Sequence, residues 1–228
     1  MQRHFDQDLL VLREKLLTMA SHAEQSVALA MKALVERDDA LARQVKAADA
    51  TLDQFEIDMD ELGIKLLALK APVAGDLRLI TMAMKISQNL ERMGDEATTI
   101  ARRVLVLNQE APLKLLVDLP RMAAIAVEML RGSLESFVSM NPALARQIIA
   151  RDHEVDEINK QVHREVVSLM VENPQTITRG LNLMVISKSL ERIADHATNI
   201  AEEIVFLCEG WDIRHAAHRA ALESRQTS

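Results

Sequence analysis

One charged, helix-forming block occurs twice in the chain, as LERMGDEATTIARR at residues 90–103 and as LERIADHATNIAEE at residues 190–203. A second pair of matching stretches is ALARQVKAAD at 40–49 and ALARQIIARD at 143–152. The offset between copies changes slightly from one pair to the other, as happens when a helical unit is duplicated and only its turns change length. The sequence therefore predicts two copies of one unit, with the boundary near residues 108–113.

Apolar residues three and four positions apart mark long helices inside each copy. In the first copy these apolar seams run along residues 5–34, 41–69 and 79–107, with turn-forming residues between them. Long helices joined by short turns can cover one another's seams only as an up-down-up bundle. We therefore predict an all-α fold, a tandem repeat of two antiparallel three-helix bundles with six long helices. The expected domains are residues 1–110 and 111–209, followed by a short C-terminal tail at 210–228.

The composition agrees with long helices and narrows the class of partners. The chain has only six Gly and five Pro and contains no Tyr. Its formal charge is −7, without any block of Lys or Arg, which argues against a nucleic-acid partner. Cys208 is the only cysteine, so we expect neither an internal disulfide nor a Cys-based zinc site. No apolar run approaches a membrane span, and we expect a cytoplasmic protein that meets the membrane only indirectly, through partners.

Four acidic pairs have i,i+4 spacing, which places both carboxylates of a pair on one side of a helix. They are Asp49/Asp53 and Glu91/Asp95 in the first copy, and Asp152/Asp156 and Glu191/Asp195 in the second. The apolar seam of the repeated block faces the core, so its acidic pair lies on a flank. If the flanks of neighbouring helices meet, up to four carboxylates converge in each copy and need a cation or protons. Oxygen ligands predict divalent or trivalent metal ions such as Mg, Mn, Ca, Fe or Zn.

The competing interpretation is that these carboxylates belong to solvated helix faces, with Arg92 and Arg192 neutralising their Glu neighbours on adjacent helices. The recurrence of both pairs at matched positions favours a metal site. Another acidic pair, Glu56/Asp60, becomes Asn159/His163 in the second copy, so acidic pairs are not retained indiscriminately. His196 follows Asp195, but Glu96 replaces it in the first copy, and we interpret His196 as a surface residue.

The repeated pattern LER-[MI]-[GA]-D-x-A-T-x-I-A resembles the PhoU family of phosphate-signalling proteins. The resemblance extends over nearly the whole chain, through LREKLLTMASHAEQSV, LALKAPVAGDLRLI and the closing EGWDIRHAA. It implies a non-enzymatic regulator without catalytic residues, which acts with the phosphate ABC transporter and a sensor histidine kinase. Such proteins keep the phosphate-starvation response off when phosphate is plentiful. The family's E/D-x-x-x-D motifs bind metal, including iron clusters in some members, and they correspond here to the eight carboxylates named above.

Two departures from the family pattern concern the second copy. Thr178-Arg179 stands where the first copy has Asp76-Leu77-Arg78, which assigns any role of that link to the first copy only. Ala194 replaces the usual Gly, and we expect this to tighten or tilt the second site.

Two other classes of function stay open from the residues alone. A carboxylate-bridged di-iron enzyme would need Glu-x-x-His pairs inside a four-helix core, which neither copy has. A helical scaffold without any ion is the other alternative. Apolar residues outside the seams (Leu10, Leu17 and Val106), together with the resemblance, predict a homodimer or a higher oligomer.

Overall fold

The computed structural model describes residues 2–70, 72–113, 118–210 and 212–213. Long α-helices account for most of these residues, and this part of the chain contains no β-strand. A short 3₁₀ turn, η1 (Pro174–Thr176), precedes the last helix. The helices are α1 (Gln2–Glu36), α2 (Asp39–Lys70), α3 (Ala74–Leu107), α4 (Asp118–Ser139), α5 (Pro142–Glu172) and α6 (Ile177–Glu209). The predicted all-α class is confirmed.

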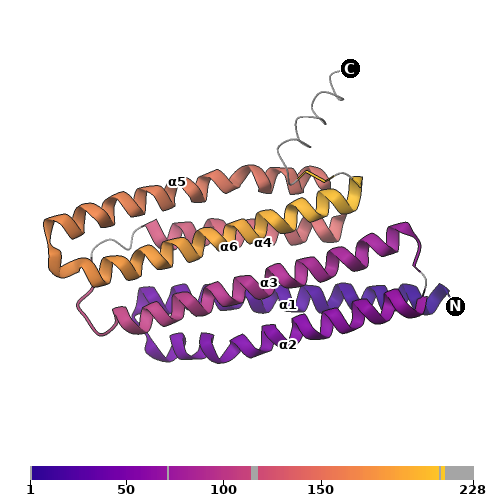
Figure 1. Cartoon of the computed structure of the whole chain (residues 1–228), viewed down its shortest axis with the longest axis horizontal. Helices are drawn as coiled ribbons and strands as arrows, with labels where there is room; N and C mark the ends of the chain where they lie inside the picture. The colour runs from indigo at the N-terminus through magenta and orange to yellow at the C-terminus, as the bar shows by residue number, and fades with distance from the viewer. Residues whose placement is uncertain (1, 71, 114–117, 211, 214–228) are drawn as a thin grey trace, which may run out of the picture.

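The helices form two three-helix bundles that lie side by side (Figure 1). One bundle consists of α1, α2 and α3, and the other of α4, α5 and α6. The third helices of the two bundles, α3 and α6, pack against each other and run in opposite directions. Lys85 of α3 pairs with Glu203 of α6 at 3.3 Å, and Glu96 pairs with Arg192 at 3.0 Å. The predicted tandem repeat of antiparallel three-helix bundles is therefore confirmed.

The predicted apolar seams form the cores of the two bundles. In the repeated block, Leu90, Met93 and Ala97 of α3 are fully buried, and so are Leu190 and Ile193 of α6. The seam of α1 is buried along its length, at Leu12, Leu16, Met19, Ala23, Val27, Ala30 and Leu34. Burial of each large apolar side chain stabilises the fold by about 1.5–3 kcal/mol. These seams therefore hold the helices of each bundle together.

The turn between the first and second helix has the same geometry in both bundles. Arg37 and Met140 occupy equivalent positions and both adopt left-handed backbone conformations, with φ of 56° and 51°. The next residue caps the following helix in each case. Asp38 Oδ1 accepts hydrogen bonds from the amides of residues 40 and 41, and Asn141 Oδ1 from those of residues 143 and 144. Such a cap contributes about 1 kcal/mol, so both copies retain the chemistry that ends one helix and begins the next.

The other helix ends agree with the predicted breaks. The first bundle turns at Pro72 between α2 and α3, and α3 ends ahead of the link that contains Pro112. Gly210, with φ of 74°, caps the C-terminal end of α6. Beyond it, only residues 212 and 213 of the predicted tail lie within the described residues. Among the helices described, none has both the length and the apolar character required to cross a bilayer.

Candidate functional site

The predicted ligands lie where the second and third helices of each bundle pack together. They form two groups in equivalent places. We call them cluster 1 (Asp49, Asp53, Glu91 and Asp95, on α2 and α3) and cluster 2 (Asp152, Asp156, Glu191 and Asp195, on α5 and α6). Their positions follow from the sequence, because the apolar seams turn the acidic flanks of neighbouring helices toward the same side of the bundle.

Small side chains allow the helices to approach closely beneath each cluster. At Gly94 of α3, an added Cβ atom would collide with Cδ1 of Leu52 on α2. The equivalent residues in the second bundle are Ala194 and Val155, and both are buried. The methyl group gained at Ala194 is thus matched by a methylene lost at Val155. In each bundle, the sizes of the two facing side chains together fit the distance between the crossing helices.

A threonine of the repeated block ties the two helices together at each cluster. Thr98 Oγ1 on α3 donates a 3.1 Å hydrogen bond to Asp49 Oδ1 on α2. Thr198 Oγ1 on α6 donates a 3.2 Å hydrogen bond to Asp152 Oδ1 on α5. Sequence reasoning did not assign these threonines to the site, although both belong to the matched positions of the block. The repetition of one contact in both bundles shows that the two clusters are built alike.

Burial and nearby carboxylates raise the pKa values of Glu91 and Asp49 in cluster 1. The pKa of Glu91, whose side chain is 13% exposed, is raised to about 7. Burial is the main cause, the negative charge of Asp95 adds to it, and Arg92 opposes it. Burial also raises the pKa of Asp49; its hydrogen bond with Thr98 opposes this shift, and nearby carboxylates add to it. A bound cation would relieve this repulsion.

Glu56 of α2 also belongs with cluster 1. Comparison of the two copies leaves Glu56 out of the predicted ligands, because Asn159 stands at this position in the second copy. In the structure its pKa is raised, first by burial and then by Asp60, with smaller contributions from cluster 1 carboxylates. Its i,i+3 spacing from Asp53 could have indicated this proximity. Asn159 instead accepts a 2.6 Å hydrogen bond from Ser187, so cluster 2 has no fifth carboxylate at this position.

Burial and nearby carboxylates also raise the pKa values of Asp195 and Asp152 in cluster 2. The pKa of Asp195 is raised to about 6, first by burial and then by Glu191 and Asp152, while Lys188 opposes the shift. Asp156 makes a smaller contribution of the same sign. Burial likewise raises the pKa of Asp152. Carboxylates of neighbouring helices are therefore close enough to interact electrostatically in both bundles.

The two clusters differ in the cations that neutralise them. In cluster 1, Arg92 Nε lies 3.4 Å from Glu91 Oε2, and its Nη1 lies 3.2 Å from Asp95 Oδ2. The equivalent Arg192 turns away from its own acidic pair and contacts Glu96 of the other bundle. In cluster 2, Lys188 instead forms an ion pair with Glu191. The contact of Arg192 with Glu96 matches the expected pairing with a Glu on an adjacent helix, whereas Arg92 pairs with residues of its own helix.

The donor atoms of both clusters suit a hard cation. Oε2 of Glu91 and Oε2 of Glu191 are buried and accept no hydrogen bond, although a cationic side chain lies near each. Carboxylate oxygens are the ligands that Mg²⁺, Ca²⁺ and iron ions accept. Within the described parts of the chain, however, no three His, Cys, Asp or Glu side chains are close enough to enclose an ion. Binding a metal here therefore requires these side chains to rotate toward a common point.

His196 lies at the boundary between the bundles. Its Nδ1 is 3.0 Å from Asn89 Oδ1 on α3, and burial lowers its pKa. The interpretation of His196 as a surface residue is wrong, because α3 covers this side of α6. Spacing within one helix could not reveal this contact, which depends on how the bundles pack.

A family model described as the PhoU domain matches the chain twice, at residues 16–104 and at residues 119–204. The chain belongs to the PhoU family. The first match covers most of α1, α2 and α3, and the second covers α4, α5 and most of α6. The family unit therefore coincides with the three-helix bundle, and the resemblance identified from the repeated block is confirmed.

Relatives match along most of the chain. The protein named phosphate-specific transport system accessory protein PhoU homolog in Pseudomonas aeruginosa is 37% identical over 214 residues, which is 93% of this chain and 88% of that protein. The protein of the same name in Aquifex aeolicus is 38% identical over 203 residues, 89% of this chain and 92% of that protein.

Solved structures of the family have the same fold. The crystal structure of PhoU from P. aeruginosa matches with a TM-score of 0.88 at 37% identity, and the match covers 90% of this chain and 99% of that chain. The phosphate transport system regulatory protein PhoU from Streptococcus pneumoniae matches with a TM-score of 0.86 at 28% identity, covering 92% of this chain and 100% of that chain.

Proposed function

We propose that this protein is a non-enzymatic regulator of phosphate uptake and of phosphate-starvation signalling. It acts on the cytoplasmic side of the membrane as an adaptor between the phosphate ABC transporter, at its ATPase subunit, and the phosphate sensor histidine kinase. When phosphate is plentiful, it represses the phosphate-starvation response. The observation that carries this proposal is the match of both bundles to the PhoU domain, together with relatives that are named accessory proteins of phosphate-specific transport.

The position of the carboxylates favours an adaptor over an oxidase. Both clusters lie on bundle flanks, between the second and third helices, and Asp53 is exposed to solvent. Di-iron carboxylate enzymes instead hold their ligands inside a four-helix core and use Glu-x-x-His pairs. Oxygen consumption by the purified protein with ferrous iron tests this choice. Catalytic turnover would favour the enzyme.

The proposal includes a hard cation in each cluster. The eight carboxylates of clusters 1 and 2 would hold these ions, and each ion would neutralise acids that now repel one another. Support comes from the raised pKa values of Glu91 and Asp195 and from the equivalent construction of the two clusters. An ion shared by two helices would also fix their relative position beside the threonine hydrogen bonds. Elemental analysis of protein purified without chelator distinguishes this state from a metal-free scaffold.

The proposed assembly is a homodimer or a higher oligomer. Leu10, Leu17 and Val106, which lie outside the predicted seams, are 57%, 37% and 40% exposed. Covering such side chains with a second copy would remove apolar surface from water. Light scattering should therefore find species larger than the 25.5 kDa chain at micromolar concentrations. A single species of that mass across the whole range would contradict the proposal.

The decisive experiment is co-purification from phosphate-replete cells, with mass spectrometry of the partners and elemental analysis of the same sample. The expected partners are the transporter ATPase and the sensor kinase. Deletion of the protein should in addition switch on a phosphate-starvation reporter in rich phosphate. A reporter that stays silent while the kinase is intact would overturn the regulatory role.

A further inference from the structure

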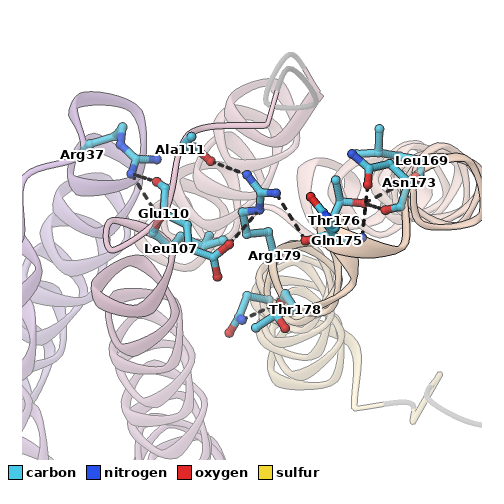
Figure 2. A network of polar contacts seen from close by, with 11 residues as sticks. Arg37, Leu107, Glu110, Ala111, Leu169, Asn173, Gln175, Thr176, Thr178 and Arg179 are labelled. Atoms are coloured by element: carbon cyan, nitrogen blue, oxygen red, sulfur yellow. Dashed lines mark hydrogen bonds and ion pairs between the residues drawn. The ribbon is translucent and has the colours of Figure 1, made fainter.

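Two arginines from different bundles hold the link between the bundles (Figure 2). Arg37, in the turn between α1 and α2, donates through Nη2 to the main-chain oxygens of Leu107 and Glu110. Arg179, in the first turn of α6, places Nε 3.1 Å from Glu110 Oε2 and donates through Nη1 to the main-chain oxygen of Ala111 at 2.9 Å. Glu110 is therefore held at its carbonyl by one bundle and at its carboxylate by the other.

Part of this arrangement follows from the end of α3. The last carbonyl groups of a helix lack partners within the helix, and they form its negative end. Arg37 supplies a donor to one of them, at Leu107, and its left-handed backbone directs the turn toward that end. This capping role accounts for the hydrogen bond from Arg37 to the main-chain oxygen of Leu107. It does not explain why a second arginine lies at the same link.

Both guanidinium groups at the junction have N–H donors to spare. Arg37 contacts main-chain oxygens and Arg179 pairs with the Glu110 carboxylate, and each guanidinium carries more N–H donors than these contacts use. The Arg179 side chain is only 16% exposed, whereas that of Glu110 is 45% exposed. The rest of the cavity between the arginines is largely apolar, lined by Leu34, Leu107, Pro112, Leu113 and Leu183. Apolar walls reduce screening by water and strengthen the attraction of a small anion.

We propose that this junction binds a free tetrahedral oxyanion, such as inorganic phosphate or sulfate, in exchange for the Glu110 carboxylate. With Glu110 in place, the space between the arginines has room for about one water molecule, so the anion enters only when this exposed carboxylate swings outward. Planar guanidinium groups bind two oxygens of such an ion in parallel hydrogen bonds. The ion would connect Arg37 of the first bundle with Arg179 of the second. This inference goes beyond the adaptor role and does not involve the acidic clusters.

The opposite end of the molecule supplies a matched comparison. Arg78, near the start of α3, lies against Gly210 at the end of α6, as Arg179 lies against the segment after α3. Arg78 and Arg179 therefore take equivalent places at the two ends, although the Asp76-Leu77-Arg78 sequence occurs in the first copy only. The position equivalent to Arg37 is Met140, and Glu209 at that end pairs with Arg146 at 2.8 Å. That end has no arginine at the position of Arg37, and its Arg146 is paired with Glu209, so it should not bind the anion.

The test is calorimetric titration of the full chain with sodium phosphate and sodium sulfate, at neutral pH and constant ionic strength set with sodium chloride. Glu110→Gln removes the competing carboxylate while keeping its size, so phosphate should bind about tenfold more tightly than to the wild type. Arg37→Gln and Arg179→Gln should each abolish binding. Arg78→Gln, the matched control, should bind like the wild type.

A purely structural junction gives a different pattern. Glu110→Gln would then lower the unfolding temperature without any gain in phosphate affinity, and that result would overturn the proposal. Equal loss of binding in Arg78→Gln would overturn it too, because it would indicate nonspecific attraction. Where Arg37→Gln or Arg179→Gln fails to fold by circular dichroism, Arg37→Lys and Arg179→Lys keep the charge but not the paired hydrogen bonds, and should bind about tenfold more weakly. Binding of a phosphomonoester such as phosphoserine in place of the inorganic ions would also contradict a site for the free ion.

Discussion

Thr198 Oγ1 donates a 3.2 Å hydrogen bond to Asp152 Oδ1 across the contact between α6 and α5. The same contact recurs between α3 and α2 in the first bundle. Each threonine fixes one carboxylate of its cluster and joins the two helices that supply the other members. These hydrogen bonds therefore set part of the relative position of the two helices at each cluster.

Replacing Thr198 by Val should remove this hydrogen bond with little change in volume. The bond lowers the pKa of Asp152, against the larger effect of burial, so the pKa of Asp152 should rise further in the variant. The free energy of unfolding at neutral pH should fall by about 1 kcal/mol. NMR titration of the Asp152 carboxyl and urea unfolding measure the two effects. Thr198→Ser keeps the hydroxyl and serves as the control; an unchanged Asp152 pKa in Thr198→Val would contradict the prediction.

Without metal, the protein should become less stable as the pH rises from about 4 to about 7. The pKa values of Glu91 and Asp195 are raised in the folded state to about 7 and about 6, from ordinary values of 4.5 and 3.8. The folded state therefore binds more protons than the unfolded state in this window. The stability that these protonated groups contribute is complete when the pH is below their ordinary pKa values. It is lost as the pH rises through their pKa values in the folded state.

Urea unfolding midpoints in the presence of chelator, measured across this pH range, test the prediction. In the double variant Glu91→Gln and Asp195→Asn, the unfolding midpoint should fall less steeply with rising pH than in the wild type, because two of the groups with raised pKa values are absent. Added Mg²⁺ should raise the wild-type midpoint most at the alkaline end, where the carboxylates are charged. A wild-type slope equal to that of the double variant would show that these two groups do not carry the effect.

Gly94→Ala should destabilise the first bundle, because the added Cβ meets Leu52 where the helices cross. Overpacking of this kind costs about 1–3 kcal/mol, partly offset by the higher helix propensity of Ala. Adding Leu52→Val should restore the stability, since the second bundle uses Ala194 with Val155. Thermal unfolding measures both variants. Gly75→Ala is the control, as a Cβ at Gly75 meets nothing nearby and should cause no loss.

The helices and the clusters were predictable because both depend on periodic patterns. Apolar spacing places the seam of the repeated block in the core, and that placement fixes the flank that carries Glu91 and Asp95. Duplication then shows which acidic pairs recur. The comparison of the two copies was also misleading for Glu56. Its counterpart is Asn159, which argues against a role as a ligand, but its i,i+3 spacing from Asp53 brings it close to cluster 1.

Contacts between the bundles could not be predicted from spacing along one helix. Arg92 and Arg192 occupy matched positions, yet one pairs with its own acidic block and the other with Glu96 of the opposite bundle. His196 is half-buried for the same reason, since α3 packs over it. The meeting of Arg37 and Arg179 at the link likewise depends on three-dimensional packing, because these residues are far apart in the sequence.

The final prediction concerns the second copy of the repeated block. Replacing Glu191 by Gln and Asp195 by Asn removes two charges and keeps the side-chain shapes, while the buried seam residues Leu190 and Ile193 stay in place, so far-UV circular dichroism should remain helical. If cluster 2 holds a cation, the metal bound per chain should fall by the share of one site, and cluster 1 should keep its own.

The apo form of this variant should gain stability, because the remaining carboxylates repel one another less. The control Glu128→Gln with Glu135→Gln removes two exposed charges from α4 and should change stability by about half a kcal/mol or less, with no change in metal content. Elemental analysis decides the outcome: if the cluster 2 variant binds as much metal as the wild type and the control, its carboxylates are a solvated helix face and the assignment of ligands in the second bundle is wrong.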